Sequence, residues 1–131
     1  MKNERRLGNQ GLQTPFDIAA KIICPAVRGS VALKLVRDYH FTQKEVADEL
    51  GLKQQAVSNY IRGMRGTIGI LAGIPELTTQ VEIITEKVLN GISGDQLLSL
   101  MNETCLRLLS NRRICQVING TENCIGDLKT S

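Results

Sequence analysis

The sequence predicts an all-α protein. Aromatic residues are few, with two Phe, two Tyr and no Trp among 131 residues, so the core must be aliphatic, which suits packed helices. Apolar residues also recur at helical spacing. Leu77, Val81, Ile84 and Val88 are separated by 4, 3 and 4 positions, which is typical of one helix face laid against another. The length fits one domain, or one small domain with an oligomerisation arm.

Two helices are expected in the first third of the chain. Thr14 is a suitable N-cap, and a proline and then Asp17 follow it in the order of a capping box. Pro25 is expected to break or kink this helix and to begin the next one, which runs to about residue 38. Within that second helix, Gly29 and Ser30 predict close packing against a neighbouring segment.

The middle of the chain predicts two short helices joined by a tight turn. The first spans 43–50, with Thr42 as its N-cap and Glu45 completing a capping box. Gly51 allows the positive φ that the turn needs, and the second helix spans 54–62. The apolar residues expected between these helices and the core are Val46, Ala47, Leu50, Leu52, Val57, Tyr60 and Ile61.

The side chains left outside on the second helix form a strip of amides, a hydroxyl and cations with no carboxylate. The strip residues are Lys53, Gln54, Gln55, Ser58, Asn59 and Arg62. Gln and Asn pair with adenine edges, and Arg or Lys with guanine. This pattern predicts a helix-turn-helix with its second helix in the DNA major groove. Arg28, Lys44 and Arg65 are expected to hold the DNA backbone. The alternative is a helical hairpin with a solvated polar face.

Three further motifs flank this segment. They are Thr14-Pro15-Phe16-Asp17, Pro25-Ala26-Val27-Arg28 and Gly63-Met64-Arg65-Gly66. With them, the segment resembles the lambda-Cro-like helix-turn-helix superfamily and, over residues 14–66, a group of archaeal predicted transcriptional regulators. The resemblance implies DNA-binding regulation and a cysteine-containing C-terminal segment. The chain departs from the group at Phe16 and Leu108, where that group often has cysteines.

Charge is unevenly distributed along the chain. Residues 1–66 carry eleven Lys/Arg and six Asp/Glu, whereas residues 67–131 carry five and seven. A basic half is suited to binding phosphates, and an acidic half is suited to contacts with protein. Chance variation in charge along the chain would also explain the difference. Residues 1–13 predict a flexible basic arm, in which Lys2, Arg5 and Arg6 either touch DNA or belong to a disordered tail.

The second half of the chain predicts a dimerisation region. After a glycine-rich linker or loose helix over 63–73, one helix is expected from Pro75 to about residue 90 and another, capped by Ser93, over 94–111. The last helix is apolar on several sides and needs more cover than a small monomer offers. We therefore expect a homodimer that reaches palindromic half-sites about 34 Å apart. The expected domains are 14–66 for DNA binding and 75–131 for dimerisation and the cysteine-containing C-terminal region, whose tail holds a short strand or helix.

Four cysteines are the candidate metal ligands: Cys24, Cys105, Cys115 and Cys124. No CxxC pair is present, which disfavours a common zinc site. Four thiolates can still hold an iron–sulfur cluster, and Cys-Pro is a familiar context for one ligand. Disulfides or redox thiols, and buried cysteines with a packing role only, are the two alternatives.

The sequence therefore predicts a homodimeric, sequence-specific DNA-binding transcriptional regulator whose cysteines respond to redox state or hold an iron–sulfur cluster. The competing interpretation is a metal- or redox-binding protein whose helix-turn-helix serves protein contact. An enzyme is not expected, because the chain has one histidine, His40 in a turn, and no phosphate-binding glycine loop or paired catalytic constellation. No signal peptide or membrane span is recognisable, so a cytoplasmic location is expected.

Overall fold

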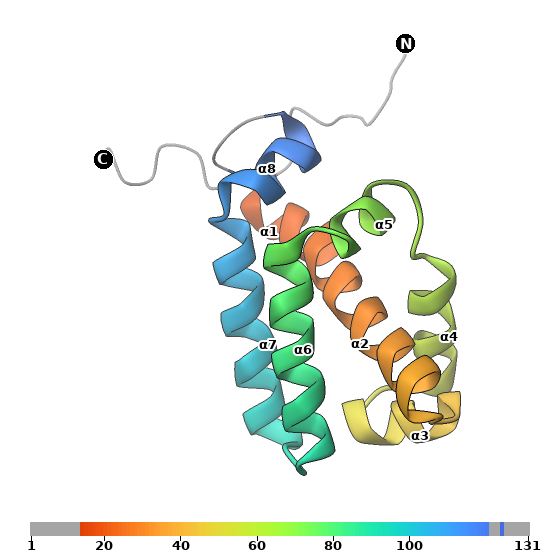
Figure 1. The fold of residues 1–131 in the computed structure, drawn as a ribbon. Coiled ribbons are helices and arrows are strands. Elements are labelled where there is room, and N and C mark those ends of the chain that lie inside the picture. Colours follow the sequence, from red (N-terminus) through yellow and green to blue (C-terminus); the bar gives the residue numbers. More distant parts are fainter. Residues whose placement is uncertain (1–13, 121–123, 125–131) are drawn as a thin grey trace.

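The computed structural model describes residues 14–120 and Cys124 (Figure 1), and these residues form helices and turns only. The all-α prediction is thus confirmed. The elements are α1 (Pro15–Ile18), η2 (Ala19–Ile23), α2 (Cys24–Tyr39), α3 (Gln43–Leu50), α4 (Gln54–Arg62), α5 (Gly66–Ala72), α6 (Pro75–Leu89), α7 (Gly94–Leu109) and α8 (Arg112–Asn119). The predicted basic arm, with Lys2, Arg5 and Arg6, lies outside the described residues.

The N-terminal helices are joined without a break. Thr14 and Asp17 form the predicted capping box at the start of α1. α2 begins near Pro25 as expected, with the proline in its first turn, where a missing N–H costs least. The chain does not leave the helical path before it, however, because the π-helical η2 connects α1 to α2. α2 ends at Tyr39, and its C-cap His40 has φ 62°.

Helix α2 is the centre of the molecule. In Figure 1, α3 and α4 lie on one side of α2, and α6 and α7 lie on the other. The apolar residues of α2 that lie between these helices are fully or almost fully buried: Ala26, Val27, Val31, Ala32 and Leu35. One aliphatic core therefore extends from α4 through α2 to α7, and α4 itself packs on α2 and α3.

The C-terminal half packs on α2 through the predicted stripe of α6. Leu77, Val81, Ile84 and Val88 are all buried. The glycine-rich segment is helical as α5, which contacts α2, η2 and α8. The tail begins with a helix, α8, whose N-cap Asn111 accepts a hydrogen bond from the Ile114 N–H. None of the helices in the described part of the chain is long and apolar enough to cross a membrane.

Helix α7 differs from the expectation in two details. Ser93 occupies the N-cap position, but its side chain makes no capping hydrogen bond. Helical spacing places Leu97, Leu98, Met101, Cys105 and Leu108 on one face, and all of them are buried except Leu98, which is exposed. The difference arises because apolar side chains cover more of the α7 surface than the side that packs against the core.

Candidate nucleic-acid interface

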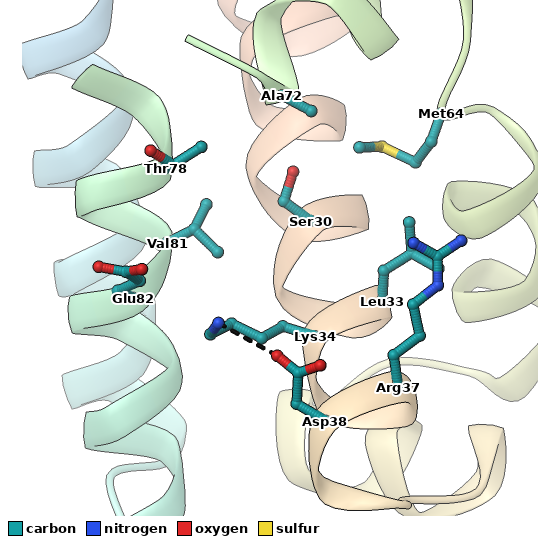
Figure 2. Close-up of a pocket in the computed structure, with 10 residues that line it drawn as sticks. All are labelled: Ser30, Leu33, Lys34, Arg37, Asp38, Met64, Ala72, Thr78, Val81 and Glu82. Atoms are coloured by element: carbon teal, nitrogen blue, oxygen red, sulfur yellow. Dashed lines mark hydrogen bonds and ion pairs between the residues drawn. The ribbon is translucent and has the colours of Figure 1, made fainter. Parts of the chain in front are cut away.

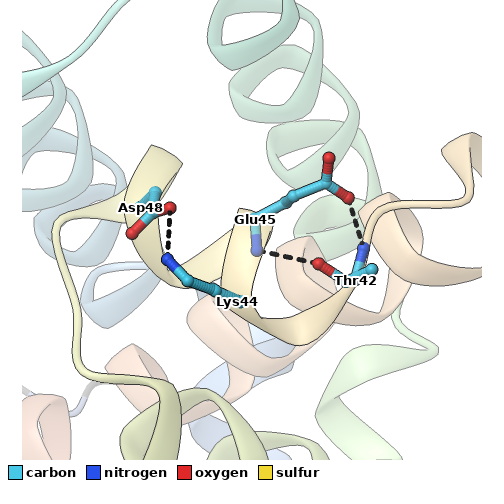
Figure 3. Close-up of polar contacts among 4 residues, drawn as sticks. All are labelled: Thr42, Lys44, Glu45 and Asp48. Atoms are coloured by element: carbon cyan, nitrogen blue, oxygen red, sulfur yellow. Dashed lines mark hydrogen bonds and ion pairs between the residues drawn. The ribbon is translucent and has the colours of Figure 1, made fainter.

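The turn between α3 and α4 is built by local signals. Figure 3 shows the capping box at the start of α3, in which the Thr42 hydroxyl accepts from the Glu45 N–H at 3.1 Å. The Glu45 carboxylate in return accepts from the Thr42 N–H at 2.8 Å. Gly51 ends α3 with φ 68°, a left-handed conformation that glycine adopts at little cost. These two features set the path of the chain into α4.

Packing then fixes the orientation of α4. Val46 and Val57 are fully buried, and Ala47, where the two helices cross closely, is 4% exposed. α4 also contacts α2 at Gly29, where a Cβ atom would overlap Met64 Sδ and lie 3.0 Å from the Tyr60 carbonyl oxygen. The close packing predicted at Gly29 is thus confirmed, and the inner side of α4 packs against both α2 and α3.

The outer side of α4 carries the predicted polar strip. Lys53, Gln54, Gln55, Asn59 and Arg62 are exposed and Ser58 is half-buried. Hydrogen bonds join four of them. Arg62 donates to Ser58 Oγ at 2.6 Å and to Asn59 Oδ1, and Gln55 Nε2 donates to the same Asn59 oxygen at 3.1 Å. The strip is therefore an ordered surface of donors and acceptors with a net positive charge.

Comparison with known families identifies this segment. Residues 33–70 match the family model described as helix-turn-helix. The segment is a helix-turn-helix. The match begins in α2 and ends in α5, so it includes the turn and the whole polar strip. Neither the curated proteins nor the solved structures contain a match to the chain.

The three cations expected to hold the DNA backbone lie in different settings. Lys44, in the first turn of α3, forms an exposed ion pair with Asp48 at 3.4 Å (Figure 3). Arg65 is exposed at the N-cap of α5. Arg28 is half-buried, it donates to the Tyr60 hydroxyl at 3.0 Å, and its guanidinium carbon lies 5.8 Å from the Tyr60 ring centroid. The side chains of Lys44 and Arg65 are thus exposed on the helix-turn-helix, whereas the Arg28 side chain already contacts Tyr60 and links α2 to α4.

A pocket of about 340 Å³ lies beside α2 (Figure 2). Its ionisable side chains have both signs, because Lys34, Arg37, Asp38 and Glu82 all line it, and Lys34 pairs with Asp38 at 3.2 Å. Phosphates favour surfaces of one positive sign. Of these two surfaces, the α4 strip therefore has the composition that suits a nucleic acid.

The four cysteines lie in two pairs. Cys115 and Cys124 form a disulfide that ties α8 to the segment after it. The sulfur atoms of Cys24 and Cys105 lie 2.8 Å apart. Among the described residues, which include all four cysteines, no group of three or more His, Cys, Asp or Glu could hold a metal ion. With one pair oxidised, this arrangement does not supply the four thiolates expected for an iron–sulfur cluster. Such a cluster stays a prediction for a reduced state of Cys115 and Cys124.

The free pair is electrostatically unequal. A hydrogen bond from the Cys105 thiol, with help from the charge of Arg28, lowers the pKa of Cys24 to about 7 in spite of partial burial. The same hydrogen bond and burial raise the pKa of Cys105. Cys24 is the more exposed of the two and precedes Arg28 by one helical turn. Cys24 is therefore the cysteine of this pair whose thiolate form is favoured, and in that form it accepts a hydrogen bond from the Cys105 thiol.

Two side-chain contacts at the site were not predicted from the sequence. The Arg28–Tyr60 contact joins residues 32 positions apart, and the Cys24–Cys105 contact joins residues 81 apart. Cys24 and Arg28 are four positions apart, which is about one helical turn, although the break or kink expected at Pro25 falls between them. That spacing was the available signal that a cation and a cysteine share one surface of α2.

Proposed function

We propose that the protein is a sequence-specific DNA-binding transcriptional regulator. The observation that supports this most directly is the carboxylate-free strip on the outer side of α4, within a segment that matches the helix-turn-helix family model. In this role, α4 enters the major groove, and the strip residues contact base edges and the flanking phosphates. Lys44 and Arg65 contact phosphates on either side of α4.

The direct test is a selection of binding sites from random double-stranded DNA with the full chain. We expect a preferred sequence, and Gln54→Ala should lower the preference at particular base pairs. Gln116→Ala removes an exposed amide from α8 and is the matched control. Salt-sensitive binding without any preferred sequence would instead favour the alternative, in which the helix-turn-helix serves protein contact and the cysteines carry the function.

We propose further that the regulator acts as a homodimer on a palindromic operator. Leu98 and Leu106 on α7 are 54% and 61% exposed, so this helix has apolar surface that its own chain leaves uncovered. A second copy covers such a surface, and it also supplies the second recognition helix that half-sites about 34 Å apart require.

The dimer can be tested by light scattering coupled to size-exclusion chromatography. We expect the mass of a dimer for the native chain and of a monomer for Leu106→Glu. Ile70→Glu is the matched control, because Ile70 on α5 is 60% exposed and lies outside the proposed interface. A native chain that elutes as a monomer at micromolar concentration, or equal dissociation by both variants, would contradict the proposal.

The regulator is also proposed to respond to redox state. The pairing of all four cysteines supports this, because thiol pairs change covalent state with the oxidants around them. The test of this part is a comparison of DNA affinity between fully reduced and oxidised protein.

A further inference from the structure

The free cysteines make an unusually close contact between distant parts of the chain. Cys24 begins α2 and Cys105 lies in the second half of α7, yet their sulfur atoms are 2.8 Å apart. A disulfide bond is about 2.05 Å long, so an approach of roughly 0.8 Å would bring these sulfur atoms to bonding distance. The helices can therefore keep their positions while the bond forms and breaks.

We propose that Cys24 and Cys105 are a redox-active pair, which a hydroperoxide oxidises to an intramolecular disulfide with Cys24 as the attacking sulfur. This inference rests on the redox-responsive part of the proposed function and gives it a specific site. It assigns the sensing role to the α2–α7 contact, whereas Cys115 and Cys124 are already joined in a disulfide.

Exposure and charge assign a different role to each sulfur. Cys24 is half-buried, so a molecule as small as hydrogen peroxide can reach it, and Arg28 favours its thiolate form. Cys105 is only 7% exposed, and its sulfur lies 2.8 Å from the Cys24 sulfur. Peroxide therefore meets Cys24 first, and Cys105 is placed to react with the product.

The reaction balances in two steps. The Cys24 thiolate attacks one peroxide oxygen, an S–O bond forms, the O–O bond breaks, and the departing hydroxide takes a proton to give water. The Cys105 sulfur then attacks the Cys24 sulfenic acid, the S–O bond breaks, and the released hydroxide combines with the Cys105 proton as a second water. Two thiols lose two electrons and two protons, and one peroxide becomes two waters.

The pair is connected to the recognition helix through Arg28. The guanidinium that favours the Cys24 thiolate also donates to the hydroxyl of Tyr60 in α4 and lies over its ring. Oxidation removes the negative charge next to Arg28 and ties α2 to α7. We expect this change to reach α4 through the Arg28–Tyr60 contact and to alter DNA affinity.

The test is peptide mapping of the full chain after stoichiometric hydrogen peroxide and alkylation of the remaining thiols. We expect a Cys24–Cys105 cross-linked peptide that dithiothreitol removes, and a melting temperature higher by about 5–10 °C, because the bond closes a long loop. Recovery of Cys24 and Cys105 as alkylated thiols, or of Cys24 as sulfinic acid without the cross-link, would overturn the proposal.

Two variants test the order of events. Cys105→Ser should leave a Cys24 sulfenic acid that dimedone traps, and Cys24→Ser should leave Cys105 unmodified because it is buried. Trapping at Cys105 in the second variant would reverse the assigned roles. Mapping of the unaltered chain decides the existence of the pair even where a variant fails to fold.

DNA binding is measured separately on the reduced and oxidised forms. A cross-link that forms without a change in DNA affinity would overturn the coupling to α4 and leave DNA binding itself supported. Absence of sequence-specific binding in both forms would overturn the proposed regulator, while the mapping would still decide the thiol pair. The two failures are thus distinguishable.

Discussion

Arg62 and Ser58 lie one turn apart on α4, and the arginine Nη1 donates a hydrogen bond to the serine hydroxyl at 2.6 Å. The same guanidinium donates to Asn59 Oδ1, which also accepts from Gln55. Four strip residues are thus joined to one another, whereas no described residue bonds to the Gln54 side chain. A DNA base must compete with existing hydrogen bonds at Asn59 but not at Gln54.

Asn59→Ala should therefore affect DNA recognition more than Gln54→Ala. Each substitution removes a base contact, which costs about 1–3 kcal/mol at the contacted base pair. Asn59→Ala also removes the acceptor that positions Arg62 and Gln55, so discrimination at neighbouring base pairs should fall as well. Affinities for the selected site and its single-base variants measure both effects. Equal weakening on every sequence by both variants would show that α4 does not face the bases.

Arg65→Ala should weaken binding to all sequences alike. Arg65 is exposed at the start of α5, next to α4, and its expected partner is a phosphate. Loss of one phosphate contact should reduce the slope of log affinity against log salt by about 1. Lys21→Ala removes the same charge from η2 and is the control. A change in base preference with an unchanged salt slope would place Arg65 against a base instead.

Gly29→Ala should destabilise the fold although alanine favours helices. The added Cβ would overlap Met64 Sδ, which can swing aside, and would also press on the Tyr60 carbonyl oxygen at 3.0 Å, which can move little. Overpacking of this kind costs about 1–3 kcal/mol, against a helix-propensity gain of about 1 kcal/mol. We expect a net loss by urea unfolding, and a smaller loss in a Met64→Ala background. A more stable Gly29→Ala protein would contradict this account.

The structure shows which features a sequence can predict here. The capping box of Thr42 and Glu45 and the turn at Gly51 are determined within ten residues, so the bounds of α3 and α4 followed from the sequence. The burial of Val57 and the exposure of the strip followed from helical periodicity. These local signals were enough to predict the helix-turn-helix and the exposed polar strip on α4.

Contacts between distant residues did not follow in the same way. The glycines of α5 predicted a linker or loose helix, but Leu71 is fully buried in the core and its packing offsets the helix propensity lost at glycine. Cys24 and Cys105 are 81 residues apart, and no periodicity relates them. Their pairing depends on how α2 and α7 meet, which is a property of the whole core.

Thr42→Ala should cost more stability than Ser93→Ala. Both residues occupy N-cap positions, but only Thr42 accepts a side-chain hydrogen bond, from the Glu45 N–H (Figure 3). Loss of an N-cap of this kind costs about 1 kcal/mol. Urea unfolding of the two variants gives a direct comparison, with Ser93→Ala as the control for the loss of a hydroxyl at an N-cap. Equal losses would mean that the hydrogen bond itself contributes little.

The alkylation rate of Cys24 should depend on pH with a midpoint near 7. The hydrogen bond from Cys105 and the charge of Arg28 lower the pKa of Cys24 to about 7, so its thiolate is depleted as the pH falls through that value. Arg28→Gln removes the favourable charge and should move the midpoint upward, whereas Arg28→Lys should keep it nearer 7. Iodoacetamide labelling followed by mass spectrometry measures both rates. A midpoint near that of an ordinary thiol in the native chain would mean that neither Cys105 nor Arg28 stabilises the thiolate, and Cys24 would lose its assignment as the attacking sulfur.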